Sequence, residues 1–295
     1  MGAIHKENKG TLTYNGVGID SRNGQQELTV GRRIRYGLTI AGGALLFVAG
    51  CLFLVLLIPL FMVSALVSKG SSHLARTMMA FCLRVFAGYI RLSGFVRFDP
   101  EELRAIGRLP DGVGRVLAPT HPCLLDALLI IAYRPQVGCI MKASLVKNPL
   151  ISPCAKMAKF IPNSPVIRMI RDSKAAIKAG QTLLIFPEGT RTKPGASLNP
   201  FRPAAAAIAT ATGCPAVPVI IRSDSPYGQK GWPMWKIPAH PMTLKFSICD
   251  EIMPEPGESS RDFNQRLEEQ FRDLLAPPSE TAVMDSRKDR SKRCA

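Results

Sequence analysis

The stretch from Tyr36 to Ser68 contains 33 residues and not one charged side chain, and this feature limits the fold of the chain more than any other. Its centre, residues 44–67, reads ALLFVAGCLFLVLLIPLFMVSALV. A helix of about 20 apolar residues crosses a bilayer, so the stretch is long enough for one tilted transmembrane helix. Pro59 lies within the apolar run, and proline kinks or breaks a helix. A re-entrant helical hairpin is therefore the second interpretation, and a buried core helix, which rarely extends this far without charge, is the third.

Basic residues are concentrated beside this stretch. The 295-residue chain has 38 Lys and Arg against 22 Asp and Glu, a formal net charge of +16, although 46% of its residues are hydrophobic. That apolar fraction excludes a disordered basic protein, and eight cysteines in this length do not indicate a disulfide scaffold. No acidic residue occurs between Glu27 and Asp99, and this placement favours an anionic membrane surface over nucleic acid, for which no recognition motif is present. Eight basic residues, half of the net charge, fall in that interval: Arg32, Arg33, Arg35, Lys69, Arg76, Arg84, Arg91 and Arg97.

The composition divides the chain into four segments. Residues 1–34 form a polar tail that we expect to be disordered, and residues 277–295 form a second, basic one. Between them lie the transmembrane or re-entrant segment 35–68 and a globular domain at 69–276.

The globular domain opens with a predicted amphipathic helix at 71–91. Its apolar positions include Leu74, Met78, Phe81 and Val85, and arginines are interspersed among them. A basic amphipathic helix suits the membrane interface, and an ordinary surface helix packed on the domain fits the pattern equally well.

Strand-like and helical patterns alternate from residue 116 onward. Strands are expected at 116–119, 138–141, near 160, 182–186, 216–222 and 243–248. Helices are expected at 124–132, 149–159, 167–179, 204–212 and 259–275. This alternation predicts the α/β class, with a largely parallel sheet flanked by helices. The N-terminal hydrophobic membrane helix or helical hairpin would precede that domain.

His121 has the strongest catalytic context of the four histidines. It stands where a predicted strand ends and a predicted helix begins, and Pro122 follows it, a residue favoured at the first helical position. Asp126 is five residues further on, and an imidazole placed just before the helix can fold back toward the first turn, where Asp126 projects. An aspartate on one ring nitrogen leaves the other nitrogen as a base. On spacing alone, a capping histidine beside a solvated aspartate is the alternative.

Cys123, two residues after His121, is a second candidate for chemistry. A helix N-terminus lowers a thiol pKa, which would make the side chain a nucleophile. Most free cysteines are small packed hydrophobes, so we expect Cys123 to be a packing residue.

A second cluster follows the predicted strand at 182–186 and reads Pro187-Glu188-Gly189-Thr190-Arg191. Glycine lets the backbone approach a ligand closely, and arginine binds phosphate with a bidentate fork. The carboxyl ends of strands are where α/β sheets bind ligands. The alternative is a surface turn with an exposed ion pair between Glu188 and Arg191.

Together these residues resemble the glycerolipid acyltransferase family, which includes the 1-acylglycerol-3-phosphate acyltransferases. The resemblance covers residues 115–223 closely and 69–276 more loosely. Four blocks carry it: H-x4-D at His121 and Asp126, K-x-x-L-x-x-x-P at Lys142, Leu145 and Pro149, F-P-E-G-T-R from Phe186 to Arg191, and V-P-V-x-x at 217–221.

The resemblance implies roles for the matching positions. His121 would deprotonate the acceptor hydroxyl and Asp126 would orient His121, while acyl-CoA or acyl carrier protein would donate the acyl group. The acceptor's phosphate would be held by Lys142, Gly189, Thr190 and Arg191, with Glu188 ordering that site. Neither a metal nor another cofactor is expected, and no Cys/His spacing indicates a zinc site.

The chain departs from the family pattern in three places. The second block usually closes with an arginine, but the run here is Phe160-Ile161-Pro162-Asn163, which leaves Arg168 or Arg171 as replacements. Pro203 stands where a glycine is usual, and Thr120 stands where an asparagine is usual.

The leading hypothesis is therefore a membrane-bound O-acyltransferase of phospholipid synthesis that acts on a lysophosphatidate-like acceptor. The absent arginine supports an alternative acceptor, another lysolipid or a specialised lipid headgroup. The run at 229–238 is also similar to a bacterial subgroup linked to aryl-polyene-type lipid assembly. A catalytically inactive lipid-binding relative is the third hypothesis. We expect the protein at the bacterial inner membrane with its domain facing the cytoplasm, because acyl thioester donors are cytosolic.

Overall fold

The computed structural model describes residues 13–14, 17–18, 52, 72–148, 152–232 and 242–276. The chain divides into two units, residues 1–42 and 43–295. In the first unit, strand β1 (Thr13–Tyr14) pairs with the antiparallel strand β2 (Val17–Gly18). The predicted membrane segment 35–68, apart from residue 52, and the tail 277–295 lie outside the described residues. Among the helices that can be described, none has the length and apolarity needed to cross a membrane.

Seven strands of the second unit form one sheet in the order β3-β9-β8-β4-β7-β5-β6. Strands β4 to β8 run parallel to one another, whereas β9 runs antiparallel to β8 and β3 is parallel to β9. The expected α/β class with a largely parallel sheet is confirmed, with a reversed pair of strands at one edge. The strands are β3 (Val96–Arg97), β4 (Arg115–Pro119), β5 (Gly138–Met141), β6 (Ile161–Pro162), β7 (Thr182–Leu184), β8 (Ala216–Ser223) and β9 (Met242–Ile248).

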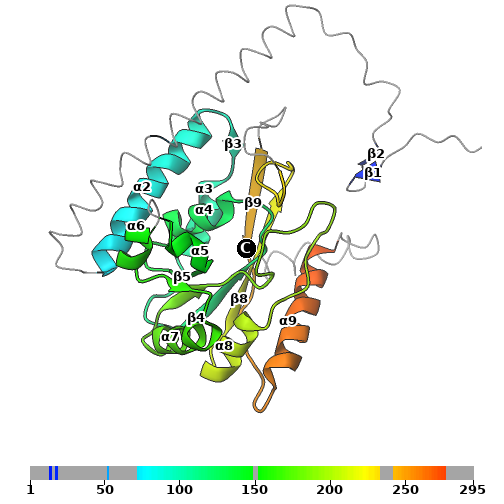
Figure 1. Ribbon diagram of the computed structural model, residues 1–295. Coiled ribbons are helices and arrows are strands. Elements are labelled where there is room, and N and C mark those ends of the chain that lie inside the picture. The colour runs from blue at the N-terminus through cyan, green and yellow to red at the C-terminus, as the bar shows by residue number, and fades with distance from the viewer. Residues whose placement is uncertain are drawn as a thin grey trace, which may run out of the picture. The chain divides into compact units, whose positions relative to one another are not determined.

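Helices cover both faces of the sheet, and Figure 1 shows α2 and α9 on opposite sides of it. Helices α2, α3 and α4 form one layer, and α7, α8 and α9 form the other. The helices are α2 (Ser72–Leu92), α3 (Pro100–Gly107), α4 (Leu125–Tyr133), α5 (Ala143–Val146), α6 (Ser152–Met157), α7 (Val166–Lys178), α8 (Ala204–Thr212) and α9 (Ser260–Leu275).

The central strands supply side chains to a hydrophobic core on each face, because successive residues of a strand point to opposite sides. In β4, Val116 and Ala118 pack toward α7, α8 and α9, whereas Leu117 packs toward α2, α3 and α4. In β8, Ile220 packs toward α7, α8 and α9, and Val219 packs toward α2, α3 and α4. A parallel sheet covered on both faces requires such continuous apolar runs.

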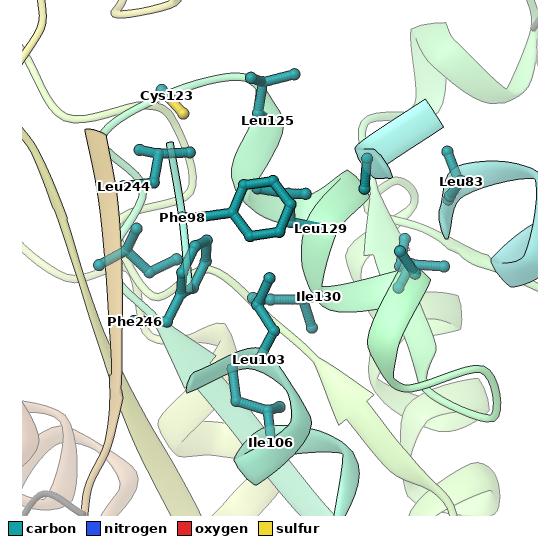
Figure 2. Packing of buried hydrophobic residues seen from close by; sticks show 14 of the residues in the cluster. Leu83, Phe98, Leu103, Ile106, Cys123, Leu125, Leu129, Ile130, Leu244 and Phe246 are labelled. Atoms are coloured by element: carbon teal, nitrogen blue, oxygen red, sulfur yellow. The ribbon is translucent and has the colours of Figure 1, made fainter. Parts of the chain in front are cut away.

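The core beneath α3 and α4 is the part that supports the candidate active site. Figure 2 shows Phe98 between the side chains of α3, α4 and β9. The labelled partners are Leu103, Ile106, Leu129, Ile130, Leu244 and Phe246. Helix α4 is therefore fixed along its length by buried apolar contacts.

Helix α2 packs on the domain, but through a different face from the one that the sequence emphasises. Its buried residues are Ala75, Ala80, Leu83, Phe86, Ala87 and Ile90. The predicted apolar positions Leu74, Phe81 and Val85 are exposed, and Phe81 is 67% exposed. The helix thus has two apolar faces, one against α4 and α6 and one uncovered by the described residues.

Sequence patterns missed two helices and placed one boundary differently. Helix α3 was not predicted, although Asp99 caps it by accepting the Glu101 backbone N–H at 2.9 Å and Pro100 opens it. Helix α5 is one short turn. The predicted helix start at residue 149 lies outside the described residues, which resume at Ser152, where α6 begins. Strand β7 ends at Leu184, two residues before the predicted end at 186.

Replacing Leu129 with Ala is expected to lower the free energy of unfolding by about 2–5 kcal/mol, because a buried leucine leaves a cavity when truncated. Leu92→Ala is the matched control, since Leu92 is 91% exposed, and it should change stability by less than about 0.5 kcal/mol. Chemical denaturation of the full chain, followed by circular dichroism, measures both. Equal losses in the two variants would contradict the assigned core.

Candidate active site

Two loops that are distant in sequence meet because β4 and β7 are parallel neighbours, with Leu117 paired to Leu184. The loops that follow these strands leave the same edge of the sheet, where α/β proteins bind ligands. The backbone N–H of His121 donates to Oε1 of Glu188 at 3.0 Å, and the Thr192 N–H donates to the His121 carbonyl at 2.8 Å. The two sequence clusters therefore form one site.

His121 and Asp126 make the contact that their spacing suggested. Helix α4 begins at Leu125, so His121 lies before the helix and Asp126 lies in its first turn. Nδ1 of His121 is 3.1 Å from Oδ2 of Asp126. Asp126 is fully buried, whereas the His121 side chain is 16% exposed. With Nδ1 directed at a carboxylate, Nε2 is the nitrogen available to a substrate.

The ring of Phe186 fixes the plane of the His121 imidazole. The two rings stack with centroids 3.9 Å apart and an interplanar angle of 23°. Asp126 sets which nitrogen faces inward, and Phe186 sets the plane of the ring. The first residue of the F-P-E-G-T-R block thus contacts the histidine of the first block directly.

Cys123 supports Asp126 and is not arranged as a nucleophile. Its backbone N–H donates to Oδ2 of Asp126 at 2.8 Å, and its thiol donates to Oδ1 at 2.9 Å. Burial first, and then the charge of Asp126, raise the pKa of the Cys123 thiol well above its usual value. A thiol that stays protonated can donate a hydrogen bond but cannot attack a thioester. Cys123 is therefore a buried packing residue, as predicted, and it also hydrogen-bonds Asp126.

Glu188 lies beneath the site, with 1% of its surface exposed. Its carboxylate accepts the His121 N–H, the Asn199 N–H at 2.9 Å, and the Thr192 hydroxyl, which is 2.9 Å from both oxygens. Burial raises the pKa of Glu188, and these hydrogen bonds oppose that rise. Because its oxygens accept hydrogen bonds from both loops, Glu188 connects them, which agrees with the ordering role that the resemblance implies.

Gly189, Thr190 and Arg191 lie in the loop directly above Glu188. Gly189 has a φ of 65°, a conformation that favours glycine, and a Cβ there would meet the side chain of Arg202 at 3.0–3.3 Å. Nη1 of Arg191 donates to the carbonyls of Gly228 at 2.7 Å and Gln229 at 3.1 Å. Arg191 therefore ties this loop to the segment after β8.

Lys142 is exposed at the end of β5, which lies next to β7 and two strands from β4. Asn163, at the position where relatives carry arginine, accepts the Ala143 N–H through Oδ1 at 3.0 Å. Asn163 thereby connects the end of β6 to the turn that carries Lys142. The replacements suggested by the sequence, Arg168 and Arg171, both pair with Asp172 on α7.

Several residues that shape the site were not identified from sequence. Phe186, Thr192 and Asn199 act through contacts that no local pattern reveals. Thr120 is buried, and its hydroxyl bonds both the carbonyl and the N–H of Ile221, so it extends the pairing of β4 with β8. The usual asparagine is thus replaced by a residue with a structural role.

Arg202 is the other residue that sequence reasoning missed. Its exposed side chain lies against Gly189, and no acidic side chain in the described part of the chain pairs with it. Pro203, which replaces the usual glycine, stands immediately before helix α8. The sequence offered only a basic residue two positions before the predicted helix at 204–212.

A family model, curated relatives and a solved structure that resemble this chain are all acyltransferases. Residues 100–222 match the family model described as Acyltransferase. The chain is 26% identical over 143 residues to the 1-acyl-sn-glycerol-3-phosphate acyltransferase BAT2, chloroplastic, of Brassica napus, which is 45% of this chain and 41% of that protein. It is 23% identical over 184 residues to the 1-acyl-sn-glycerol-3-phosphate acyltransferase of Pseudomonas aeruginosa, 59% of this chain and 68% of that protein. The protein of the same name from Helicobacter pylori is 28% identical over 123 residues, 40% of this chain and 52% of its own length.

The match thus spans less than half of the Brassica protein and about half of the Helicobacter protein. Among solved structures, the 1-acyl-sn-glycerophosphate (LPA) acyltransferase PlsC from Thermotoga maritima is similar, with a TM-score of 0.62 and 22% sequence identity. That similarity covers 83% of this chain and 97% of the other. The two chains share a fold, which agrees with the mixed, mostly parallel sheet and its flanking helices.

Replacing Glu188 with Gln is expected to lower the free energy of unfolding by about 1–3 kcal/mol, because an amide N–H would then face a buried donor. Thr192→Ser retains the hydroxyl that Glu188 accepts and should change stability much less. Chemical denaturation of both variants gives the comparison. Unchanged stability of Glu188→Gln would contradict the role assigned to this carboxylate.

Proposed function

We propose that this chain, which matches the Acyltransferase family model over residues 100–222, is a glycerolipid acyltransferase that transfers a fatty acyl group to the hydroxyl of a lysophosphatidate-like acceptor. Acyl-CoA or acyl carrier protein is the proposed donor, and no other cofactor enters the proposal. The observation that carries it is the His121–Asp126 contact, which leaves Nε2 of a partly exposed imidazole free of Asp126. The curated relatives are named for the same class of acceptor.

The geometry supports a general-base mechanism. Nε2 of His121 takes the proton of the acceptor hydroxyl as the oxygen attacks the carbonyl carbon of the thioester. Asp126 stabilises the imidazolium that results. The tetrahedral intermediate then collapses, the carbon–sulfur bond breaks, and the thiolate takes the proton from His121. One ester bond forms and one thioester bond breaks, so the imidazole returns to its starting state.

The acceptor's phosphate would lie against the loop formed by Gly189, Thr190 and Arg191. Lys142 supplies a further positive charge from the same edge of the sheet. The arginine that relatives carry at position 163 is absent, and Asn163 is engaged with the Ala143 N–H. We assign the replacement to Arg202, because its side chain packs against Gly189 and has no acidic partner among the described residues.

Membrane attachment is a further part of the proposal. The apolar segment 35–68 supports it, and so does the exposed apolar face of α2, which presents Phe81, Val85 and Leu92. We place the protein at the inner face of a bacterial inner membrane, with the catalytic domain in the cytoplasm where thioester donors occur. Its role would then be in phospholipid synthesis.

An alternative acceptor is favoured by Asn163, since the phosphate grip differs from that of relatives. Another lysolipid or a specialised lipid headgroup would use the same His121 chemistry. The similarity to the aryl-polyene-linked subgroup rests on the run 229–238, most of which lies outside the described residues. A catalytically inactive lipid-binding relative is the third candidate. Detection of acyl transfer in the assay below would exclude it.

His121→Ala should reduce acyl transfer by about 10²–10⁴-fold, because the variant lacks the base that removes the hydroxyl proton. The assay uses lysophosphatidate with long-chain acyl-CoA, and in parallel with acyl carrier protein as the donor. The thermal unfolding temperature serves as the control and should stay close to that of the parent chain. Full activity in a folded His121→Ala variant would refute the mechanism.

Arg202→Gln should raise KM for lysophosphatidate by about 10–100-fold with a smaller effect on kcat, because a hydrogen bond to a charged group contributes about 1.5–3 kcal/mol. Arg168→Gln is the matched control, since Arg168 pairs with Asp172. Steady-state kinetics of the two variants decide the assignment. A raised KM in Arg168→Gln alone would move the phosphate contact to α7.

A further inference from the structure

A cavity of about 490 Å³ lies between α2, α3 and the end of α4. Its lining residues are Arg84, Gly88, Arg91, Phe98, Pro100, Arg104, Gly107, Arg108 and Tyr133. Tyr133 is the last residue of α4, whereas His121 lies before the first. A nine-residue helix is about 13 Å long, so this cavity is at the far end of α4 from the candidate active site.

Four arginines give the cavity its charge. Two of them, Arg104 and Arg108, share the carboxylate of Glu101, and the Arg108 contact is 2.8 Å. Arg104, and then Arg108, lower the pKa of Glu101, so this carboxylate is ionised at neutral pH. One negative charge against four positive charges leaves the cavity with a net charge of +3, which suits an anion.

The two arginines from α2 differ in how they are held. Arg84 donates to the Ala132 carbonyl through Nε at 3.2 Å and Nη2 at 2.9 Å, and it lies 5.4 Å above the centre of the Tyr133 ring. Its guanidinium is therefore fixed in place before any ligand arrives. Arg91 is exposed and has no ion pair with the described residues, so it is available to an anion.

The α2 side of the cavity borders the uncovered apolar face of that helix. Successive residues of an α-helix are about 100° apart, which places Arg84, Gly88 and Arg91 between the buried face and the stripe formed by Phe81, Val85 and Leu92. The stripe and the cavity are thus neighbouring surfaces of one helix. Helix α2 contains no acidic residue that would repel an anion.

We propose that this cavity binds the phosphate of an anionic phospholipid headgroup while the apolar stripe of α2 contacts the acyl region of the membrane. The proposal rests on the membrane attachment proposed above and adds a specific lipid site that is separate from the substrate site. A phosphate fits because arginine guanidinium groups bind it with paired N–H donors. A lipid is favoured over a free anion because the basic cavity adjoins the apolar stripe. A phospholipid likewise carries its anionic headgroup next to its apolar tails, so it matches both surfaces at once.

The test is co-sedimentation of the full chain with vesicles of phosphatidylcholine alone or with added phosphatidylglycerol. The double variant Arg91→Gln/Arg108→Gln removes two charges and keeps the fixed Arg84. Each arginine near an anionic surface contributes about 1 kcal/mol, which predicts about 30-fold weaker binding to the mixed vesicles. The control Arg261→Gln/Arg272→Gln carries the same charge change on α9, on the other face of the sheet, and should bind within about threefold of the parent chain.

Two further measurements distinguish an anionic phospholipid from two other ligands of the cavity, the acyl donor and a free anion. Acyl transfer to a short-chain, water-soluble lysophosphatidate without vesicles should be equal in the two double variants. A selective fall in that rate for Arg91→Gln/Arg108→Gln would assign the cavity to the acyl donor and overturn the lipid proposal. Unchanged vesicle binding, together with loss of stabilisation by inorganic phosphate, would assign it to a free anion. Absence of acyl transfer in the parent chain would count against the proposed enzyme but not against a lipid site seen by co-sedimentation.

Discussion

The buried carboxylate of Glu188 holds together the chain segments on which the candidate active site depends. It accepts hydrogen bonds from the backbone of His121 and of Asn199 and from the Thr192 hydroxyl. Desolvation of a carboxylate is unfavourable unless its oxygens find donors. Here the donors come from the loop after β4 and the loop after β7, so the hydrogen bonds to this carboxylate also fix the position of His121.

Two of the residues that depart from the family pattern also make hydrogen bonds inside the protein. Thr120 uses its hydroxyl to continue the pairing of β4 with β8, which stabilises the backbone that leads into His121. Asn163 bonds the turn that presents Lys142. Thr120 and Asn163 therefore each have a partner in the protein itself. Asn163 carries no positive charge, so the phosphate site that we propose depends on Arg202 instead.

The fold class and most elements were predictable because apolar periodicity is local. The strand at 138–141 and the helix at 204–212 match β5 and α8 at both ends. The His121–Asp126 contact was also predictable, since it depends on one helix start. The donors that surround Glu188, the stacking of Phe186 and the face on which α2 packs were not, because each depends on which segments become neighbours in the sheet. The resemblance implied that Glu188 orders the site, but the motif did not show which backbone and side-chain groups its carboxylate would bond.

The position of β4 has a consequence for how the domain folds. It is the first of the five parallel strands in the chain but lies at the centre of the sheet, between β7 and β8. The contact of His121 with Glu188 spans 67 residues, and that of Thr120 with Ile221 spans 101. Contacts of such long range form slowly because a large loop must close first. During synthesis on the ribosome, His121 therefore cannot make its final contacts until β7 and β8 have emerged.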